Sequence, residues 1–312
     1  MLEPKIIKPI FIVGVPRSGT TLVYRMLCLH SDLAWFSHED LEFLIPKGTQ
    51  EDLKKRFTKM KENNEKIPRN EESLFVFGLK QGIPLPGTLK VPIEAETFWA
   101  NCFGREYITD IFEDKKNQVI HAIQRILEKE KKSRFLNKSP QNSMRVFALK
   151  KTFPDAKFIN IARDPRSVIA SMLTRLEREG HFNIGIPLKN INNLKISSLI
   201  QKFQSKSKNY DAVKNFAKSY EEITESMYDF FKSNQENCIN IIYEELLAKP
   251  ESEISKILEF CELEKPSDIR RLIPIMQETQ NKWKEKITRE DEKKIFKITK
   301  SSLEKMQYPY KI

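Results

Sequence analysis

The sequence predicts an α/β protein in which helices cover both faces of a central parallel sheet. Largely apolar predicted strands at residues 10–13, 157–162 and 238–243 each lead into a polar turn, and residues 135–140 are predicted to form a strand that ends in a turn. Apolar residues at helical spacing follow these turns, and this alternation of strand and helix favours a parallel sheet. A length of 312 residues, with 39% hydrophobic and 31% charged, fits one soluble domain over residues 1–312 with helical insertions.

The first predicted strand leads into a tight loop that suits an anion. Residues 10–13 are apolar and mostly β-branched or aromatic, whereas residues 22–29 have helical spacing. Gly14 and Gly19 allow the backbone between strand and helix to turn sharply. The amide N–H groups of residues 18–21 then converge at the positive end of the helix, which favours a phosphate or a sulfate.

The spacing of this loop matches the phosphate-binding loop (P-loop) of nucleoside triphosphatases with one departure. Four residues separate Gly14 from Gly19, but Thr20 replaces the lysine that normally precedes Thr21. The cation has moved to Arg17, inside the loop. Because that lysine reaches the phosphates beside magnesium, its absence argues against simple ATP or GTP hydrolysis. The spacing indicates a P-loop-type three-layer α/β/α fold; the alternative is an ordinary glycine-bearing turn.

A second candidate site follows a short predicted strand at residues 33–37. His38, Glu39 and Asp40 come directly after it, where an open parallel sheet presents side chains to a ligand. A carboxylate or an imidazole at this edge is a candidate catalytic base. The alternative is structural, with these polar residues capping and solvating the first turn of a helix at 41–45.

Residues 47–132 are predicted to form a helical insertion. Residues 47–72 are polar and charged, residues 82–88 form a loop rich in proline and glycine, and a helix begins within 92–99. Residues 114–132 form an amphipathic helix with its apolar side chains on one face. An insertion of this length can form a lid over an acceptor-binding site.

The strand at residues 157–162 leads into a second pattern that suits an anion. Arg163 follows the strand, Pro165 begins the next helix, and Ser171 lies two turns into it. Arg175 lies four residues further along the same face. Two guanidinium groups and a hydroxyl can enclose one dianionic phosphate. The alternative for both arginines is surface ion pairing with neighbouring carboxylates.

The last third of the chain is predicted to be mainly helical. Helices at residues 210–232, 251–261 and 288–306 flank the strand at 238–243, and residues 180–208 are irregular.

Composition limits the classes of partner. The net charge of +11 suits anionic ligands, but no helix-turn-helix, zinc or aromatic RNA-binding pattern indicates nucleic acid. The four cysteines lack metal-ligand spacing, so we expect reduced thiols and no bound metal. No apolar run reaches the ~20 residues that span a bilayer, so we expect a cytoplasmic protein without a transmembrane segment.

Two stretches resemble the sulfotransferases that use 3′-phosphoadenosine 5′-phosphosulfate (PAPS). They are Pro-Arg-Ser-Gly-Thr-Thr at residues 16–21 and the segment 153–175. Weaker matches occur at residues 138–140, 243–246 and 281–283. The resemblance is strongest to the branch that contains tyrosylprotein sulfotransferases and their bacterial relatives, and it covers most of the chain outside the insertion.

This resemblance implies a role for each matching residue. The 5′-phosphosulfate would be held by Arg17, Ser18, Gly19, Thr20 and Thr21. The 3′-phosphate would be held by Arg163, Ser171 and Arg175. Tyr243 would lie near the nucleotide, and Lys282 would lie in a C-terminal loop that closes over it. Glu39 is the nearest equivalent of the glutamate that acts as the catalytic base in the tyrosylprotein branch. Because this match needs a one-residue shift, His38 is a competing candidate for the base.

The sequence therefore predicts transfer of a sulfuryl group from PAPS to a hydroxyl or amine acceptor. Arg17 and the loop amides would stabilise charge on the departing oxygen, and no metal is expected. The acceptor class stays open among small molecules, carbohydrates and peptides. One alternative is a divergent P-loop nucleotide kinase or NTPase. The other is a non-enzymatic basic module that binds polyanions, which only the net charge supports.

Overall fold

A five-stranded parallel sheet forms the centre of the computed structural model. The structure describes residues 5–44, 90–104, 110–179, 211–273 and 282–310. The strand order is β2-β3-β1-β4-β5, and every neighbouring pair is parallel. In chain order the strands are β1 (Ile10–Val13), β2 (Leu33–Ala34), β3 (Arg134–Lys138), β4 (Lys157–Ala162) and β5 (Cys238–Ile242). The predicted parallel sheet is confirmed.

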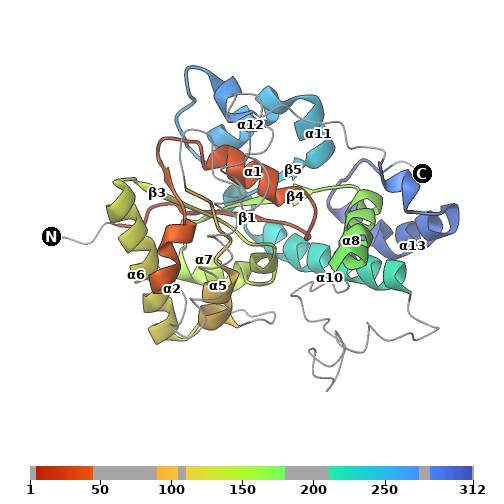
Figure 1. The fold of residues 1–312 in the computed structure, drawn as a ribbon, viewed down its shortest axis with the longest axis horizontal. Helices are drawn as coiled ribbons and strands as arrows, with labels where there is room; N and C mark the ends of the chain where they lie inside the picture. Colours follow the sequence, from red (N-terminus) through yellow and green to blue (C-terminus); the bar gives the residue numbers. More distant parts are fainter. Residues whose placement is uncertain (1–4, 45–89, 105–109, 180–210, 274–281, 311–312) are drawn as a thin grey trace.

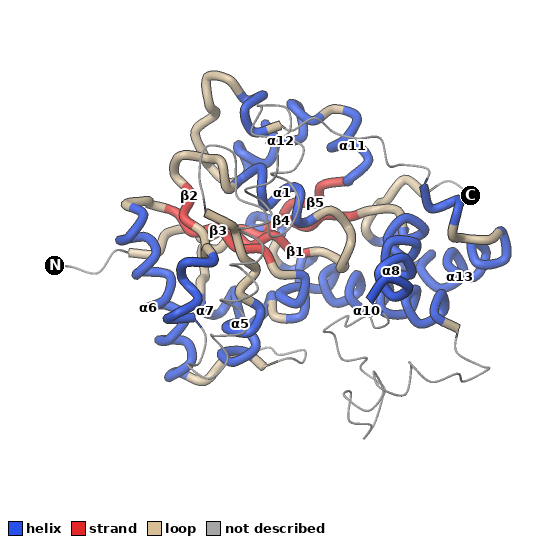
Figure 2. Tube along the Cα trace, viewed as in Figure 1, coloured by secondary structure: helices blue, strands red, loops and turns tan. Residues whose placement is uncertain are grey.

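Helices cover both faces of this sheet, as Figures 1 and 2 show. One face carries α1 (Thr20–Leu27), α11 (Tyr243–Ala248) and α12 (Pro250–Phe260). The other hydrophobic cluster includes residues of α5 (Glu96–Phe103), α6 (Glu113–Glu130), α7 (Val146–Thr152), α8 (Pro165–Glu179), α10 (Ala212–Ser233) and α13 (Arg289–Lys305). The expected three-layer α/β/α arrangement is confirmed.

The central strand β1 divides its side chains between two cores. Ile10 and Ile12 pack with α1 and α12, whereas Phe11 and Val13 pack on the opposite face. All four side chains are fully buried. A period of two with apolar residues on both faces is typical of a central strand in a parallel sheet.

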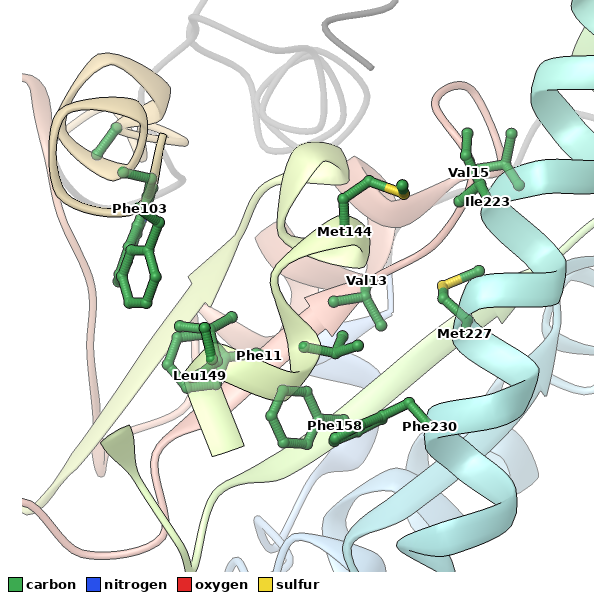
Figure 3. Packing of buried hydrophobic residues seen from close by; sticks show 14 of the residues in the cluster. Phe11, Val13, Val15, Phe103, Met144, Leu149, Phe158, Ile223, Met227 and Phe230 are labelled. Carbon is green, nitrogen blue, oxygen red and sulfur yellow. The ribbon is translucent and has the colours of Figure 1, made fainter. Parts of the chain in front are cut away.

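Aromatic packing joins the sheet to α10. The ring of Phe11 stacks on that of Phe158 in β4, with their centroids 5.7 Å apart, and Phe158 meets Phe230 of α10 edge-on at 4.9 Å. Figure 3 shows Ile223 and Met227 of α10 beside the same cluster. These ring contacts therefore hold β4 against α10.

The second strand is shorter than predicted, since β2 ends at Ala34 rather than residue 37. Residues 36–38 pair with residues 91–93 instead, in the antiparallel direction. The backbone N–H groups of His38 and Ile93 donate to carbonyl oxygens of the opposite segment at 3.0 and 2.9 Å. This pairing joins segments far apart in the sequence, so no local pattern indicates it.

A helical segment follows β3. It starts as the 3₁₀ turn η3 (Pro140–Met144) and continues as α7. Within η3, Ser143 Oγ accepts a hydrogen bond from the Gly14 N–H at 2.9 Å and donates to the Gly14 carbonyl at 3.1 Å. The turn after β3 is thereby fastened to the first residue of the glycine loop.

Part of the predicted insertion packs in the core. Trp99 of α5 and Ile123 of α6 are fully buried, and α6 confirms the amphipathic helix predicted at 114–132. Residues 45–89 lie outside the described residues, as does the irregular segment predicted at 180–208. The acceptor lid and the single-domain boundaries stay predictions.

The cysteines are free thiols, as the sequence predicted. Burial raises the pKa of Cys261 to about 12, so this thiol is protonated at neutral pH. In the part of the chain that the structure describes, no helix has the length and apolar composition needed to cross a membrane. The cytoplasmic location stays a prediction.

Replacing Phe11 with alanine tests the aromatic core. Phe11 is fully buried, so Phe11→Ala should lower the free energy of unfolding by about 3–5 kcal/mol in urea denaturation. Phe112 is 82% exposed, and Phe112→Ala should change stability by less than about 0.5 kcal/mol. Equal effects of the two substitutions would contradict this core.

Candidate active site

The loop between β1 and α1 is a tight turn. Gly14, Arg17 and Gly19 have φ angles of 147°, 76° and 103°. Glycine adopts positive φ freely, whereas an arginine there costs roughly 1–2 kcal/mol. The Leu22 N–H donates to the Gly19 carbonyl oxygen at 2.9 Å, so α1 begins directly on the turn. The first N–H groups of this helix therefore point toward the loop and can bind an anion.

Close contacts leave no room for side chains at either loop glycine. A Cβ atom on Gly14 would lie 2.9 Å from the carbonyl oxygen of Ile161 in β4. A Cβ atom on Gly19 would lie 2.3 Å from the ring of Tyr243, the first residue of α11. The structure thus brings Tyr243 against the loop.

Arg163 joins the loop to the carboxyl end of β4. Its Nη1 donates to the carbonyl oxygen of Arg17 at 3.1 Å, and its Cζ lies 4.3 Å from the ring centroid of Tyr243. The hydroxyl of Tyr220 in α10 donates to the Arg163 carbonyl oxygen at 2.9 Å. Burial raises the pKa of Tyr220 well above its ordinary value, so this hydroxyl remains a donor.

Arg17 completes the junction between the two predicted anion patterns. Its Nε donates to Ser171 Oγ, on α8, at 3.0 Å. Arg175 lies one turn further along α8 and is half-buried. The loop after β1 and the turn after β4 therefore form one continuous polar surface, although the sequence pattern gave two separate ones.

Arg166, rather than Arg163, pairs with the neighbouring carboxylate of Asp164, the kind of ion pair that the alternative interpretation expects. The Nη2 of Arg166 lies 2.7 Å from Asp164 Oδ2, and Nη1 also pairs with Glu292. Its Cζ lies 4.3 Å from the Trp283 ring centroid and 4.6 Å from that of Tyr310. Trp283 thus anchors the C-terminal segment on this arginine.

Two buried donors of this surface have no hydrogen-bond partner among the described residues. They are Ser18 Oγ and Arg163 Nε. Leaving a buried donor unpaired costs about 1–3 kcal/mol, and an acceptor atom on a bound ligand would remove this cost. Because both atoms can donate, the oxygen atoms of a phosphate or sulfate fit them.

Lys138 is a site residue to which the sequence analysis gave no role. It ends β3, the neighbour of β1, and its side chain is 3% exposed. Its Nζ donates to Thr21 Oγ1 at 2.9 Å and to Glu94 Oε1 at 2.5 Å. A cation therefore reaches Thr21 from the next strand, although position 20 holds a threonine instead of the P-loop lysine.

Glu39 and His38 lie on the turn η1 (His38–Asp40), which follows β2. The Glu39 carboxylate lies 3.5 Å from Lys129 Nζ of α6, and its side chain is 43% exposed. The Nδ1 of His38 accepts a hydrogen bond from the Val91 N–H at 3.2 Å. Asp40 accepts from the backbone N–H and hydroxyl of Ser37, as a structural turn residue does.

Lys282 is exposed at the start of the 3₁₀ turn η6 (Lys282–Glu285). An ion pair between Lys286 and Glu177, with Nζ and Oε2 2.5 Å apart, fastens this region to α8. The cofactor-closing role of Lys282 stays a prediction. So does the absence of a metal site, although the described residues contain no group of three His, Cys, Asp or Glu side chains placed to hold a metal.

The comparison with protein families decides the class of the chain. The model of the sulfotransferase family matches residues 9–267, from just before β1 to beyond α12. The chain belongs to the sulfotransferase family. The match includes the glycine loop, Lys138, the turn at Arg163 and Tyr243, whereas Lys282 lies beyond it.

This sulfotransferase is similar to curated proteins over part of their length. It is 25% identical over 257 residues to a putative protein-tyrosine sulfotransferase of Caenorhabditis briggsae, covering 82% of this chain and 65% of that protein. It is 30% identical over 183 residues to the omega-hydroxy-beta-dihydromenaquinone-9 sulfotransferase Stf3 of Mycobacterium bovis, covering 53% and 44%. The chain thus spans less than two thirds of either relative.

Solved structures show the same fold. Sulfotransferase STF9 from Mycobacterium avium has a TM-score of 0.60 at 16% identity, over 99% of this chain and 78% of that one. The sulfotransferase domain from the curacin biosynthetic pathway has a TM-score of 0.51 at 17% identity, over 98% and 100%. This sulfotransferase therefore shares their architecture at low sequence identity.

Substituting Gly19 tests the contact between the loop and Tyr243. Gly19→Ala should lower the free energy of unfolding by about 2–4 kcal/mol, since positive φ costs roughly 1 kcal/mol and overpacking about 1–3. Gly104 has a φ of 80° but open space around its Cβ position, so Gly104→Ala should show the backbone cost alone. The extra loss of stability in Gly19→Ala, beyond that in Gly104→Ala, should disappear when Gly19→Ala is made in a Tyr243→Ala background. If urea denaturation shows the same extra loss in that background, the contact between Gly19 and Tyr243 is contradicted.

Proposed function

We propose that this sulfotransferase transfers a sulfuryl group from PAPS to a hydroxyl acceptor. The observation that carries the proposal is the junction of the glycine loop with the turn after β4. Arg17 donates to Ser171 there, and Arg163 donates to the Arg17 carbonyl oxygen. A nucleotide with phosphate groups at both its 5′ and its 3′ positions suits two such adjoining groups of donors.

The loop is the proposed site of the 5′-phosphosulfate. The N–H groups at the start of α1 supply the positive end of a helix dipole. The hydroxyl of Ser18 is buried and has no hydrogen-bond partner among the described residues. The residues proposed to bind this group are Arg17, Ser18, Gly19, Thr20 and Thr21. Bound PAPS supplies the sulfuryl group and a phosphate oxygen as its leaving atom.

The turn after β4 is the proposed site of the 3′-phosphate. Arg163 has an unpaired Nε, and Ser171 and Arg175 lie one turn apart on α8. A dianion would replace part of the Arg17–Ser171 contact with charge-assisted hydrogen bonds. Tyr243 would pack near the nucleotide, and Lys282 would close over it from the C-terminal segment.

Cations next to the loop are proposed to stabilise the leaving oxygen. Arg17 lies inside the loop, and Lys138 donates to Thr21 at its edge. In a loose, in-line transfer, negative charge grows on the departing oxygen, and donors fixed in place lower its energy. A sulfuryl group carries less charge than a phosphoryl dianion, so these side chains can act without a metal.

The acceptor hydroxyl must lose its proton as it attacks sulfur. The sequence gives Glu39 as a candidate base, with His38 as its competitor. The names of the two curated relatives specify a protein tyrosine and a hydroxylated menaquinone, both of which present a hydroxyl group. We propose a hydroxyl acceptor of this kind, rather than an amine.

Replacing Arg163 tests the 3′-phosphate site. The wild-type protein should bind 3′,5′-ADP more tightly than 5′-AMP, and Arg163→Ala should weaken 3′,5′-ADP binding by about 10- to 150-fold, as expected for hydrogen bonds to a charged group. Binding of 5′-AMP should change little. Titration calorimetry with both nucleotides measures the difference.

Arg270 provides the matched control, because its side chain is 77% exposed and Arg270→Ala removes the same charge. It should bind both nucleotides as the wild type does. Equal wild-type affinities for 3′,5′-ADP and 5′-AMP would contradict the proposal. Stabilisation by magnesium-ATP alone would favour the kinase alternative, and salt-sensitive binding of random DNA without any response to 3′,5′-ADP would favour the polyanion module.

A further inference from the structure

A segment within the predicted insertion lies beside the helix that follows the glycine loop. Its residues 91–93 pair with residues 36–38 beyond the end of β2. The hydroxyl of Tyr24, on α1, donates to the Ile93 carbonyl oxygen at 3.2 Å. This segment is thus held on one side by the strand end and on the other by the helix that begins at the loop. Glu94 comes next in the chain.

Glu94 is linked to the loop through Lys138. Its Oε1 accepts a hydrogen bond from Lys138 Nζ at 2.5 Å, and the same nitrogen donates to Thr21 Oγ1 at 2.9 Å. The carboxylate is therefore two hydrogen bonds from a residue of the loop. Its side chain is 23% exposed, whereas Lys138 is 3% exposed. Glu94 is therefore the more exposed member of this ion pair.

The partners of the neighbouring carboxylates at this edge of the sheet have no described contact with the glycine loop. Asp40 is 2% exposed and accepts three hydrogen bonds, from Ser37 and Lys129. Both oxygens of Glu96 are bound, by Arg145 and by the Ser139 hydroxyl. Glu39 pairs with Lys129 of α6 at 3.5 Å. Of these carboxylates, Glu94 is the one whose described partner also donates to the loop.

We infer that Glu94 is the catalytic base that accepts the proton of the acceptor hydroxyl. This inference rests on the proposed function and replaces Glu39 in that role. A bond forms between the acceptor oxygen and sulfur while the bond from sulfur to the bridging phosphate oxygen breaks. The hydroxyl proton passes to the Glu94 carboxylate and then to solvent, and the electron pair of the broken bond stays on the bridging oxygen.

The position of Lys138 supports the assignment of Glu94 as the base. This lysine stands between the carboxylate and the loop, so it can release Glu94 and bind the bridging oxygen as negative charge grows there. The base would then act on the attacking oxygen and the cation on the departing oxygen, the two atoms in line with sulfur. Glu39, paired with Lys129 on α6, has no described link of this kind.

The test compares Glu94→Gln with the wild type, with Glu39→Gln as the rival and Glu304→Gln as a control. Glu304 is 67% exposed on α13. Transfer from ³⁵S-labelled PAPS is measured with an acidic tyrosine peptide, with farnesol, and with water as the acceptor that is always present. The affinity of every variant for 3′,5′-ADP is measured by calorimetry. If the wild-type protein does not bind 3′,5′-ADP, the proposed function itself is refuted.

Glu94→Gln should lower the transfer rate by about 100-fold or more, the range of general base catalysis, with 3′,5′-ADP affinity within about threefold of the wild type. The fall of kcat/KM toward acid pH, due to protonation of the base, should vanish in this variant. Formate should restore part of the activity of Glu94→Ala, which a merely structural role would not allow. Glu304→Gln should match the wild type.

Three results would overturn the assignment. The first is a Glu94→Gln rate above a tenth of the wild type. The second is an acid limb that persists in Glu94→Gln and vanishes in Glu39→Gln, which returns the role to Glu39. The third is a parallel loss of 3′,5′-ADP affinity and of transfer in Glu94→Gln, with no formate rescue in Glu94→Ala, which makes Glu94 a support of the nucleotide site.

Discussion

The hydrogen bond between Arg17 and Ser171 joins the glycine loop to α8, although the two residues lie 154 positions apart in the sequence, and the proposed nucleotide site lies where these two elements meet. The loop and α8 can meet because β1 and β4 are neighbours, parallel and in register, with Val13 opposite Asn160. Both strands therefore release their chains at the same edge of the sheet. The bare backbone of Gly14, against the Ile161 carbonyl, lets the loop close over that edge.

The C-terminal segment, which contains Trp283 and Tyr308, stabilises the turn after β4. Glu244 accepts a hydrogen bond from the Asp164 N–H at 3.2 Å and another from the Tyr308 hydroxyl at 2.7 Å. Burial and the negative charge of Glu244 raise the pKa of Tyr308 well above its ordinary value, so its hydroxyl remains a donor. Arg166, paired with Asp164 and stacked on Trp283, fixes the same turn. The segment thus positions the residues that follow β4.

The sequence predicted what local spacing encodes. The glycine loop, the strand at 157–162 and the placement of Arg163 beside its end are properties of short stretches, and the structure agrees with them. Lys138 and Glu94 could not be found in this way. Lys138 matters because β3 lies next to β1, and Glu94 matters because a segment far along the chain pairs with residues 36–38. Strand order and long-range pairing leave no periodic signal.

A crystal structure of the protein with 3′,5′-ADP would test most directly whether the glycine loop and the turn after β4 bind the two phosphate groups of one nucleotide. We expect the 5′-phosphate on the N–H groups at the start of α1. We expect the 3′-phosphate between Arg163 and Ser171, within hydrogen-bond distance of the Arg163 Nε, for which the described residues provide no hydrogen-bond partner. A nucleotide bound elsewhere, or one whose 3′-phosphate points into solvent away from Arg163, would contradict this arrangement.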